Sequence, residues 1–167
     1  YGKGEYWDDR YSRDPEPFDW YQRWAGLKDI FTQTVKPTHK ILNVGAGNSR
    51  LSEEMYDDGF QNIMNIDISS TVVNAMNEKY ADRSMDYKVM DIRSMDGLND
   101  GAFDVVIDKG TMDSVLCGEG STHNCQKVSF LKFMINFLVF NAFAIDLNIC
   151  INQYHVHPPY VLLQIVV

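Results

Sequence analysis

Hydrophobic and polar residues alternate along the first two thirds of the chain in short blocks that switch between two periods. Compact apolar runs occupy residues 40–44, 61–66, 85–90 and 102–107, and runs of this length bounded by turn residues are typical of buried strands. Between the first three runs, apolar residues recur every three or four positions, as on the buried face of a helix. Strands that alternate with helices build a parallel sheet. The pattern therefore predicts a single α/β domain.

Polar and glycine residues mark the ends of the helices in this pattern. Asn48 or Ser49 opens the first helix, which stops at Gly59, a residue suited to a helix C-terminus. Ser69 or Ser70 caps the second helix, because a serine hydroxyl accepts a hydrogen bond from a free backbone N–H. Both helices are thus expected to begin directly after a strand.

The N-terminal 36 residues are expected to form two helices separated by a proline break. The first covers Glu5–Ser12, and the Asp-Pro-Glu-Pro sequence at 14–17 ends it. Asp19 is expected to cap the second, which runs to about Val35. This segment contains all three tryptophans of the chain: Trp7, Trp20 and Trp24.

The turn Gly45-Ala46-Gly47-Asn48-Ser49 is the main candidate for a binding site. It follows a strand and precedes a helix, and Asp67 lies 22 residues beyond Gly45 at the end of the next strand. This is the order of a nucleotide-type cofactor site, in which the acid accepts hydrogen bonds from a ribose. Arg50 occupies the third glycine position of the dinucleotide pattern, and no Tyr-x-x-x-Lys pair is present. A nicotinamide-dependent oxidoreductase is therefore the weaker alternative.

Polar residues also end the other predicted strands. Asp91 follows the third strand, where it can accept from the exocyclic amino group of an adenine while Ile92 or Met90 covers the ring; an ordinary loop aspartate is the alternative. Asp108 and Lys109 close the fourth strand. Because parallel strands end at one edge of the sheet, these side chains are expected to converge there.

The amino-acid composition makes some classes of binding partner less favourable than others. The formal net charge of −8 argues against nucleic acid or an anionic membrane surface as the main partner and is compatible with a basic protein. Three cysteines without CxxC spacing indicate neither a disulfide framework nor a zinc site, so no metal is expected. They fit a reducing compartment, and without a recognisable secretory leader we expect a cytoplasmic protein.

Six segments together resemble a known family: residues 5–11, 18–21, 44–49, 65–70, 90–92 and 104–111. The chain is similar to class I S-adenosylmethionine-dependent methyltransferases, and more narrowly to the eukaryotic group that includes the elongation factor 1-alpha lysine methyltransferases. The Tyr-Trp-x-x-Arg-Tyr and Asp-Lys-Gly-Thr sequences carry the likeness most specifically. The resemblance implies a Rossmann-like fold with helices on both faces of a parallel sheet.

The resemblance also implies roles for individual residues toward S-adenosylmethionine. It places aromatic residues over the cofactor, glycines at its methionine end, an acid at the ribose, a second acid at the adenine and a lysine beside the sulfonium. These residues are Trp7, Tyr11, Trp20, Gly45, Gly47, Asp67, Ile68, Asp91, Ile92 and Lys109. Trp24 is expected to pack in the core, and Asp108 is expected as a structural partner of Lys109. No catalytic base is identified, and the expected substrate is protein lysine.

The likeness ends near Lys127, so we divide the chain into a methyltransferase part, 1–127, with an N-terminal aromatic cap, 1–36, and an apolar tail, 128–167. Polar interruptions make the tail a buried core segment rather than a membrane span. It is either a divergent continuation, with a helix at Phe130–Phe143 and a strand at Ala144–Ile151, or an abnormal product such as read-through of an unspliced intron. The abrupt change in composition favours the second. The alternative function is accordingly an incompetent fragment that binds the cofactor or a partner protein.

Overall fold

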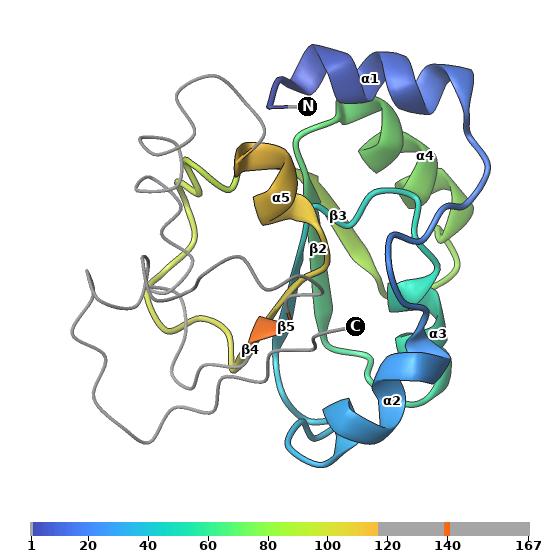
Figure 1. The fold of residues 1–167 in the computed structure, drawn as a ribbon. Coiled ribbons are helices and arrows are strands. Elements are labelled where there is room, and N and C mark those ends of the chain that lie inside the picture. Colours follow the sequence, from blue (N-terminus) through green and yellow to red (C-terminus); the bar gives the residue numbers. More distant parts are fainter. Residues whose placement is uncertain (1, 117–138, 141–167) are drawn as a thin grey trace.

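The computed structural model describes residues 2–116 and 139–140 (Figure 1). Its strands form one parallel sheet in the order β3-β2-β1-β4-β5. The bounds are β1 Ile41–Val44, β2 Ile63–Asp67, β3 Asp86–Val89, β4 Val105–Asp108 and β5 Val139–Phe140. The order reverses between β1 and β4, and ligands of open α/β sheets bind in the crevice beyond the carboxyl ends of the strands at such a reversal.

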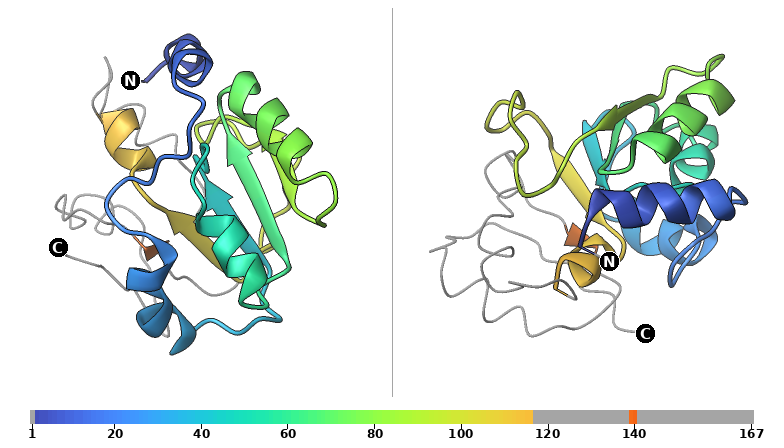
Figure 2. Two further views of the ribbon diagram at one scale, coloured as in Figure 1. Left: turned by 90° about the vertical axis from the view of Figure 1, so that its right-hand side faces the viewer. Right: turned by 90° about the horizontal axis from the view of Figure 1, so that it is seen from above.

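Helices cover both faces of the sheet, which confirms the predicted fold class. Helices α2, α3 and α4 lie on one face and α5 lies on the other (Figure 1), while α1 crosses the end of the sheet from which α4 begins (Figure 2). The bounds are α1 Gly4–Arg13, α2 Trp24–Thr32, α3 Leu51–Asp57, α4 Ser70–Lys79 and α5 Thr111–Leu116. Among these described helices, none combines the length and the apolar character needed to cross a bilayer.

Alternating side chains of the strands form two apolar layers. On one face Ile41 and Ile107 pack with Trp24, Phe31 and others of α2 and α3, so the expected core position of Trp24 is confirmed. On the other face are Leu42, Val44, Ile66, Val106 and Val115. Strands buried on both faces explain the continuous apolar runs of the sequence.

The second expected helix is present but starts later than predicted, and a later expected helix is contradicted in part. The second helix begins at Trp24 instead of Asp19, because the Asp19 side chain faces inward and pairs with Lys109. Residues 139 and 140, inside the expected helix Phe130–Phe143, form the strand β5 parallel to β4, because Val and Phe favour strands. The rest of that range lies outside the described residues. The expected strand at Ala144–Ile151 lies outside the described residues.

Three polar side chains are buried inside the first apolar layer. The Asn43 amide donates to Ser52 Oγ at 3.0 Å and to Asn65 Oδ1 at 3.1 Å, and Ser52 Oγ donates to the same oxygen at 2.5 Å. All three are at most 3% exposed. Because buried polar groups are costly without partners, this triad fixes the packing of α3 against β1 and β2.

Asn65→Ala should therefore destabilise the fold, because it removes the acceptor of the buried Ser52 hydroxyl and one of the two acceptors of the Asn43 amide. We expect a loss of about 2 kcal/mol or more in the free energy of unfolding, measured by urea denaturation. Asn74→Ala, on the exposed side of α4, is the matched control and should change it by less than about 0.5 kcal/mol. Equal losses in the two variants would contradict the role of the triad.

Candidate functional site

A cavity lies at the carboxyl ends of the strands, beneath the N-terminal cap. Its walls come from the glycine turn after β1, the end of β2, the loop after β3, the start of α5 and the cap itself. All ten residues singled out from the sequence line it: Trp7, Tyr11, Trp20, Gly45, Gly47, Asp67, Ile68, Asp91, Ile92 and Lys109. The structure thus brings them together, and their contact with a cofactor stays a prediction.

The glycine turn has no room for larger residues. Gly45 has a φ of +59°, and a Cβ atom there would lie 1.9 Å from Thr111 Oγ1. That hydroxyl is fixed because it donates to the Val44 carbonyl oxygen at 2.9 Å. Gly47 has a φ of +55°, and its Cβ would lie 2.6 Å from the Tyr11 hydroxyl. The turn is therefore shaped both by its backbone conformation and by contacts with α5 and α1.

Asp67 connects the turn to the start of α4. Its Oδ2 accepts from the Gly47 N–H and its Oδ1 from the Ser69 N–H, each at 2.9 Å. Burial raises the pKa of this carboxyl, and the two N–H groups oppose the rise. Ser69 caps α4 by accepting from the Val72 N–H, as predicted, so Asp67 is not the cap. A carboxylate has about four acceptor positions, and the two remaining ones can serve ribose hydroxyls.

Asp91 forms an ion pair with Arg93, a residue that was not among those expected from the sequence to line the site. The Arg93 guanidinium binds it through Nη2–Oδ2 at 2.7 Å and Nε–Oδ1 at 2.8 Å. Partial burial raises the pKa of Asp91, but the Arg93 side chain and backbone N–H outweigh burial and lower it. Arg93 Nη1 also donates to the carbonyl oxygen of Gly2. The guanidinium thereby connects this end of the cavity to the start of the cap.

Aromatic rings form the cap side of the cavity. Trp7 and Tyr11, one helical turn apart on α1, stack with centroids 5.9 Å apart and planes at 29°. Phe18 and Trp20 meet edge to face at 5.0 Å. Burial raises the pKa of the Tyr11 hydroxyl, so Tyr11 is neutral at physiological pH. Ring faces of this kind attract cations.

Lys109 lies at the β4 end of the cavity in a buried ion pair. Its Nζ is 3.3 Å from Asp19 Oδ1 and donates to the Trp20 carbonyl oxygen at 3.0 Å, and both charged side chains are 8% exposed. Burial lowers the pKa of Lys109, and Asp19 opposes the fall. Asp19 also accepts from the Ser49 hydroxyl. The ion pair therefore joins the cap, the glycine turn and β4.

The expected pairing of Asp108 with Lys109 is wrong, because Asp108 instead caps α5. Its Oδ1 accepts from the Thr111 N–H at 2.9 Å, and the side chain is fully buried. Burial raises the pKa of Asp108 to about 7, against the backbone N–H groups that lower it.

Two further residues that the sequence did not single out anchor the cap. The Asn48 amide donates to the carbonyl oxygens of Pro15 and Glu16, and its Oδ1 accepts from the Phe18 N–H. Asp8 accepts from the Ser69 hydroxyl at 2.6 Å. Tertiary anchors of this kind carry little local sequence signal; for Asn48 the one clue was a polar residue inside the glycine turn.

Two comparisons with known sequences bear on this site. Residues 42–128 match the family model described as "Methyltransferase domain". Over 122 residues, 71% of the chain, it is 42% identical to the eEF1A lysine and N-terminal methyltransferase of Bos taurus and 38% identical to EEF1A lysine methyltransferase 4 of the same species. It spans 17% and 48% of these relatives, respectively, and so less than half of either.

Solved structures share the fold. A glycopeptide N-methyltransferase, MtfA, complexed with S-adenosyl-L-homocysteine matches with a TM-score of 0.54 and 16% identity, over 79% of this chain and 58% of that one. A protein described as a putative Zn-dependent alcohol dehydrogenase, from Rhodobacter sphaeroides, matches with 0.59 and 19% identity, over 90% and 57%. At these identities the likeness is one of fold alone. Within residues 2–116 and 139–140, no group of three or more His, Cys, Asp or Glu side chains could hold a metal ion.

Gly45→Ala should destabilise the protein through the clash with Thr111 as well as through its positive φ. We expect a loss of about 3 kcal/mol or more in the free energy of unfolding. Gly59→Ala is the matched control, because Gly59 has a φ of +96° but nothing within 4 Å of an added Cβ, and backbone strain alone should cost about 1 kcal/mol. Thermal denaturation measures both; equal losses would show that the contact with α5 does not constrain the turn.

Asp19→Asn should destabilise the fold by about 3 kcal/mol at neutral pH, because it leaves the Lys109 ammonium buried without its partner. Without the carboxylate the pKa of Lys109 falls further below its unfolded value, so protonation opposes folding. The deficit must then shrink as the pH rises through the lowered pKa toward about 10.

Urea denaturation of the Asp19→Asn variant at about pH 7 and pH 9.5 tests this sign. The exposed Asp29 of α2 provides the control Asp29→Asn, whose effect should be small at both values. A deficit that is unchanged or larger at the higher pH would contradict a buried, charged Lys109.

Proposed function

Because the chain belongs to the methyltransferase-domain family, we propose that its cavity binds S-adenosylmethionine and that the whole protein transfers the methyl group to a protein lysine. The observation that carries the proposal is the convergence of ten residues, expected from the sequence to bind this cofactor, on one cavity at the carboxyl ends of the strands. The 38–42% identity to two eEF1A methyltransferases supports the same activity and acceptor class.

The chemistry of the cavity fits this cofactor from end to end. Asp91 and Ile92 offer a carboxylate and an apolar surface for adenine, and Asp67 offers free acceptor positions for ribose hydroxyls. At the other end the narrow glycine turn at Gly45 leaves backbone groups accessible. The aromatic cap suits a positively charged sulfonium, which ring faces attract.

Methyl transfer needs alignment more than acid–base catalysis. When bound, S-adenosylmethionine supplies a methyl group already activated by the positive sulfur, so the protein mainly has to orient and enclose the reactants. Trp7, Tyr11 and Trp20 exclude water from above, and the Asp19–Lys109 pair holds the cap in place. A lysine acceptor must lose its proton, and an apolar, aromatic surrounding lowers the pKa of an amine.

The names of the similar proteins suggest which protein accepts the methyl group. The names of the two mammalian proteins specify eEF1A lysine methylation, and we propose eEF1A or a similar basic protein as the substrate of this one. The net charge of −8 favours a basic partner. We also propose a cytoplasmic location, as the cysteine usage suggests.

A second candidate is an incompetent fragment that binds the cofactor or a partner protein without transferring a methyl group. It is favoured by the abrupt change to an apolar composition near residue 128, where the family match also ends. In this case the cavity retains its ligand, and the acceptor half of the site is incomplete. The two candidates thus agree on cofactor binding and differ in transfer.

Calorimetric titration with S-adenosylhomocysteine and with NAD distinguishes both of these candidates from a nicotinamide-dependent oxidoreductase. We expect S-adenosylhomocysteine to bind in the micromolar range, as cofactor products commonly do, with about 8 kcal/mol of binding free energy, and NAD not to bind. Binding of NAD alone would eliminate the methyltransferase proposal. Incubation with tritiated S-adenosylmethionine and purified eEF1A then tests transfer: labelled eEF1A supports the enzyme, and unlabelled eEF1A despite S-adenosylhomocysteine binding supports the fragment.

A further inference from the structure

Tyr21 has an unusual backbone conformation beside the cavity. Its φ is 62°, and in the described part of the chain it is the only residue besides glycine with a positive value. Such strain persists only where surrounding contacts enforce it, and it gathers at functional sites. The enforcing contacts are at the Trp20 carbonyl oxygen, which accepts from Lys109 Nζ at 3.0 Å and from the Gln22 N–H at 2.9 Å. The buried lysine therefore fixes the turn that orients Tyr21.

This orientation places Tyr21 at the β4 end of the cavity. A Cβ on Gly110, which lines the cavity, would lie 3.2 Å from Tyr21 Cε2, so the ring packs closely on that glycine. The Tyr21 hydroxyl donates to Asp113 Oδ2 at 2.9 Å. Ser114, the next residue of α5, lines the cavity as well. Tyr21 and Asp113 thus lie next to two residues that line the cavity, Gly110 and Ser114.

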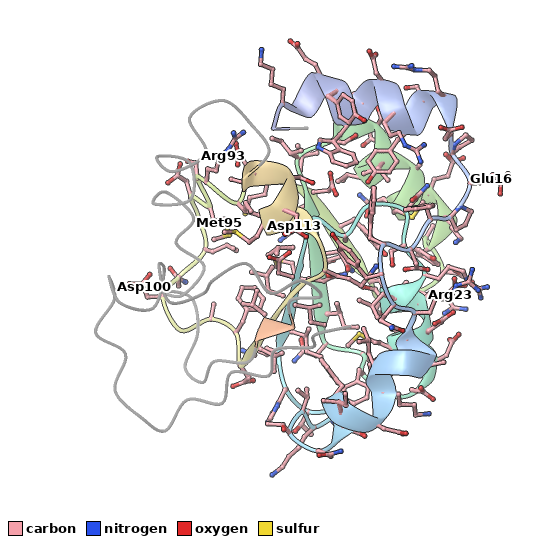
Figure 3. The ribbon with its side chains drawn as sticks, viewed as in Figure 1. Glu16, Arg23, Arg93, Met95, Asp100 and Asp113 are labelled. Carbon is pink, nitrogen blue, oxygen red and sulfur yellow. The ribbon has the colours of Figure 1, made fainter. Side chains whose placement is uncertain are left out.

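The other carboxylate oxygen of Asp113, Oδ1, accepts no hydrogen bond from the described residues. Asp113 Oδ1 is buried, and it has no hydrogen-bond partner among the described residues; Figure 3 shows the side chain at α5, near the centre of the molecule. A buried carboxylate oxygen without water or a donor is unfavourable, and a bound cation or N–H group relieves it. The oxygen therefore points to a ligand with positive charge.

Three exposed aromatic rings belong to the segment that contacts Asp113 through Tyr21. Phe18, Trp20 and Tyr21 are each between 44% and 46% exposed, whereas Asp19 between them is buried. Rings of this kind attract an ammonium group through their faces and pack against an alkyl chain. A carboxylate beside aromatic rings matches the two parts of a lysine side chain, the charged end and the apolar stem.

We propose that Asp113 and the aromatic residues 18, 20 and 21 form the entry site for the acceptor lysine, with the ammonium group donating to Asp113 Oδ1. The inference rests on the proposed function and adds to it a subsite and the class of partner segment, a basic stretch with an accessible lysine. Asp113 is a positioning residue: it selects and orients a cationic acceptor and does not contact the cofactor. The net charge of −8 favours approach of such a segment.

A tetralysine peptide titrated onto the protein saturated with S-adenosylhomocysteine tests the subsite by NMR chemical-shift changes. Asp113→Asn should weaken peptide binding about tenfold, because a charge-assisted hydrogen bond is lost. Asp100→Asn makes the same charge change on an exposed loop away from α5 (Figure 3) and should alter binding less than about twofold. Tyr21→Leu, which removes the ring face and the hydroxyl, should weaken it about threefold.

The affinity for S-adenosylhomocysteine is measured first in every variant, and it should be unchanged. Failure of the wild-type protein to bind S-adenosylhomocysteine would count against the proposed function itself. Intact S-adenosylhomocysteine binding with equal peptide affinity in the Asp113→Asn and Asp100→Asn variants would overturn the subsite. So would a wild-type protein that binds S-adenosylhomocysteine but not tetralysine. If Asp113→Asn fails to fold, unchanged peptide affinity in Tyr21→Leu is the result that overturns it.

Discussion

The buried ion pair between Asp19 and Lys109 is the interaction on which the rest of the site depends. Two charges that are almost fully removed from water must stay together, because separating them leaves each one buried and unpaired. Asp19 belongs to the cap and Lys109 to the end of β4, so the pair prevents the cap from leaving the sheet. It also explains why the second helix starts late, since the residue expected to cap that helix faces inward.

The cap and the glycine turn shape the cavity together. Tyr11 lies against Gly47, Thr111 lies against Gly45, and Asn48 holds the backbone at residues 15–18. Each contact crosses between segments far apart in the sequence, and together they close the cavity at the carboxyl ends of the strands. A cavity built this way favours a ligand that is enclosed and oriented, which is what methyl transfer requires.

The sequence predicted those features of the fold and the site that depend on local pattern. The strands at residues 40–44 and 61–66, the Ser69 cap and the carboxylates at strand ends follow from hydrophobic periodicity and from the geometry of parallel sheets. The partners of Asp19, Asp91 and Asp108 did not follow, because each is set by tertiary packing or by a short loop rather than by spacing. The short helix α5 was missed as well; its six residues contain too few periods to give a helical signal. The family resemblance supplied roles that the residue pattern alone left open.

We propose above all that this cavity holds S-adenosylmethionine under a closed cap. A crystal structure of the protein with S-adenosylhomocysteine tests it most directly. We predict adenine between Asp91 and Ile92, ribose hydroxyls at Asp67, the amino-acid end at Gly45, and an unbroken contact between Asp19 and Lys109. Ligand density elsewhere on the molecule, or a cap displaced from β4 with the ligand in place, would contradict the account.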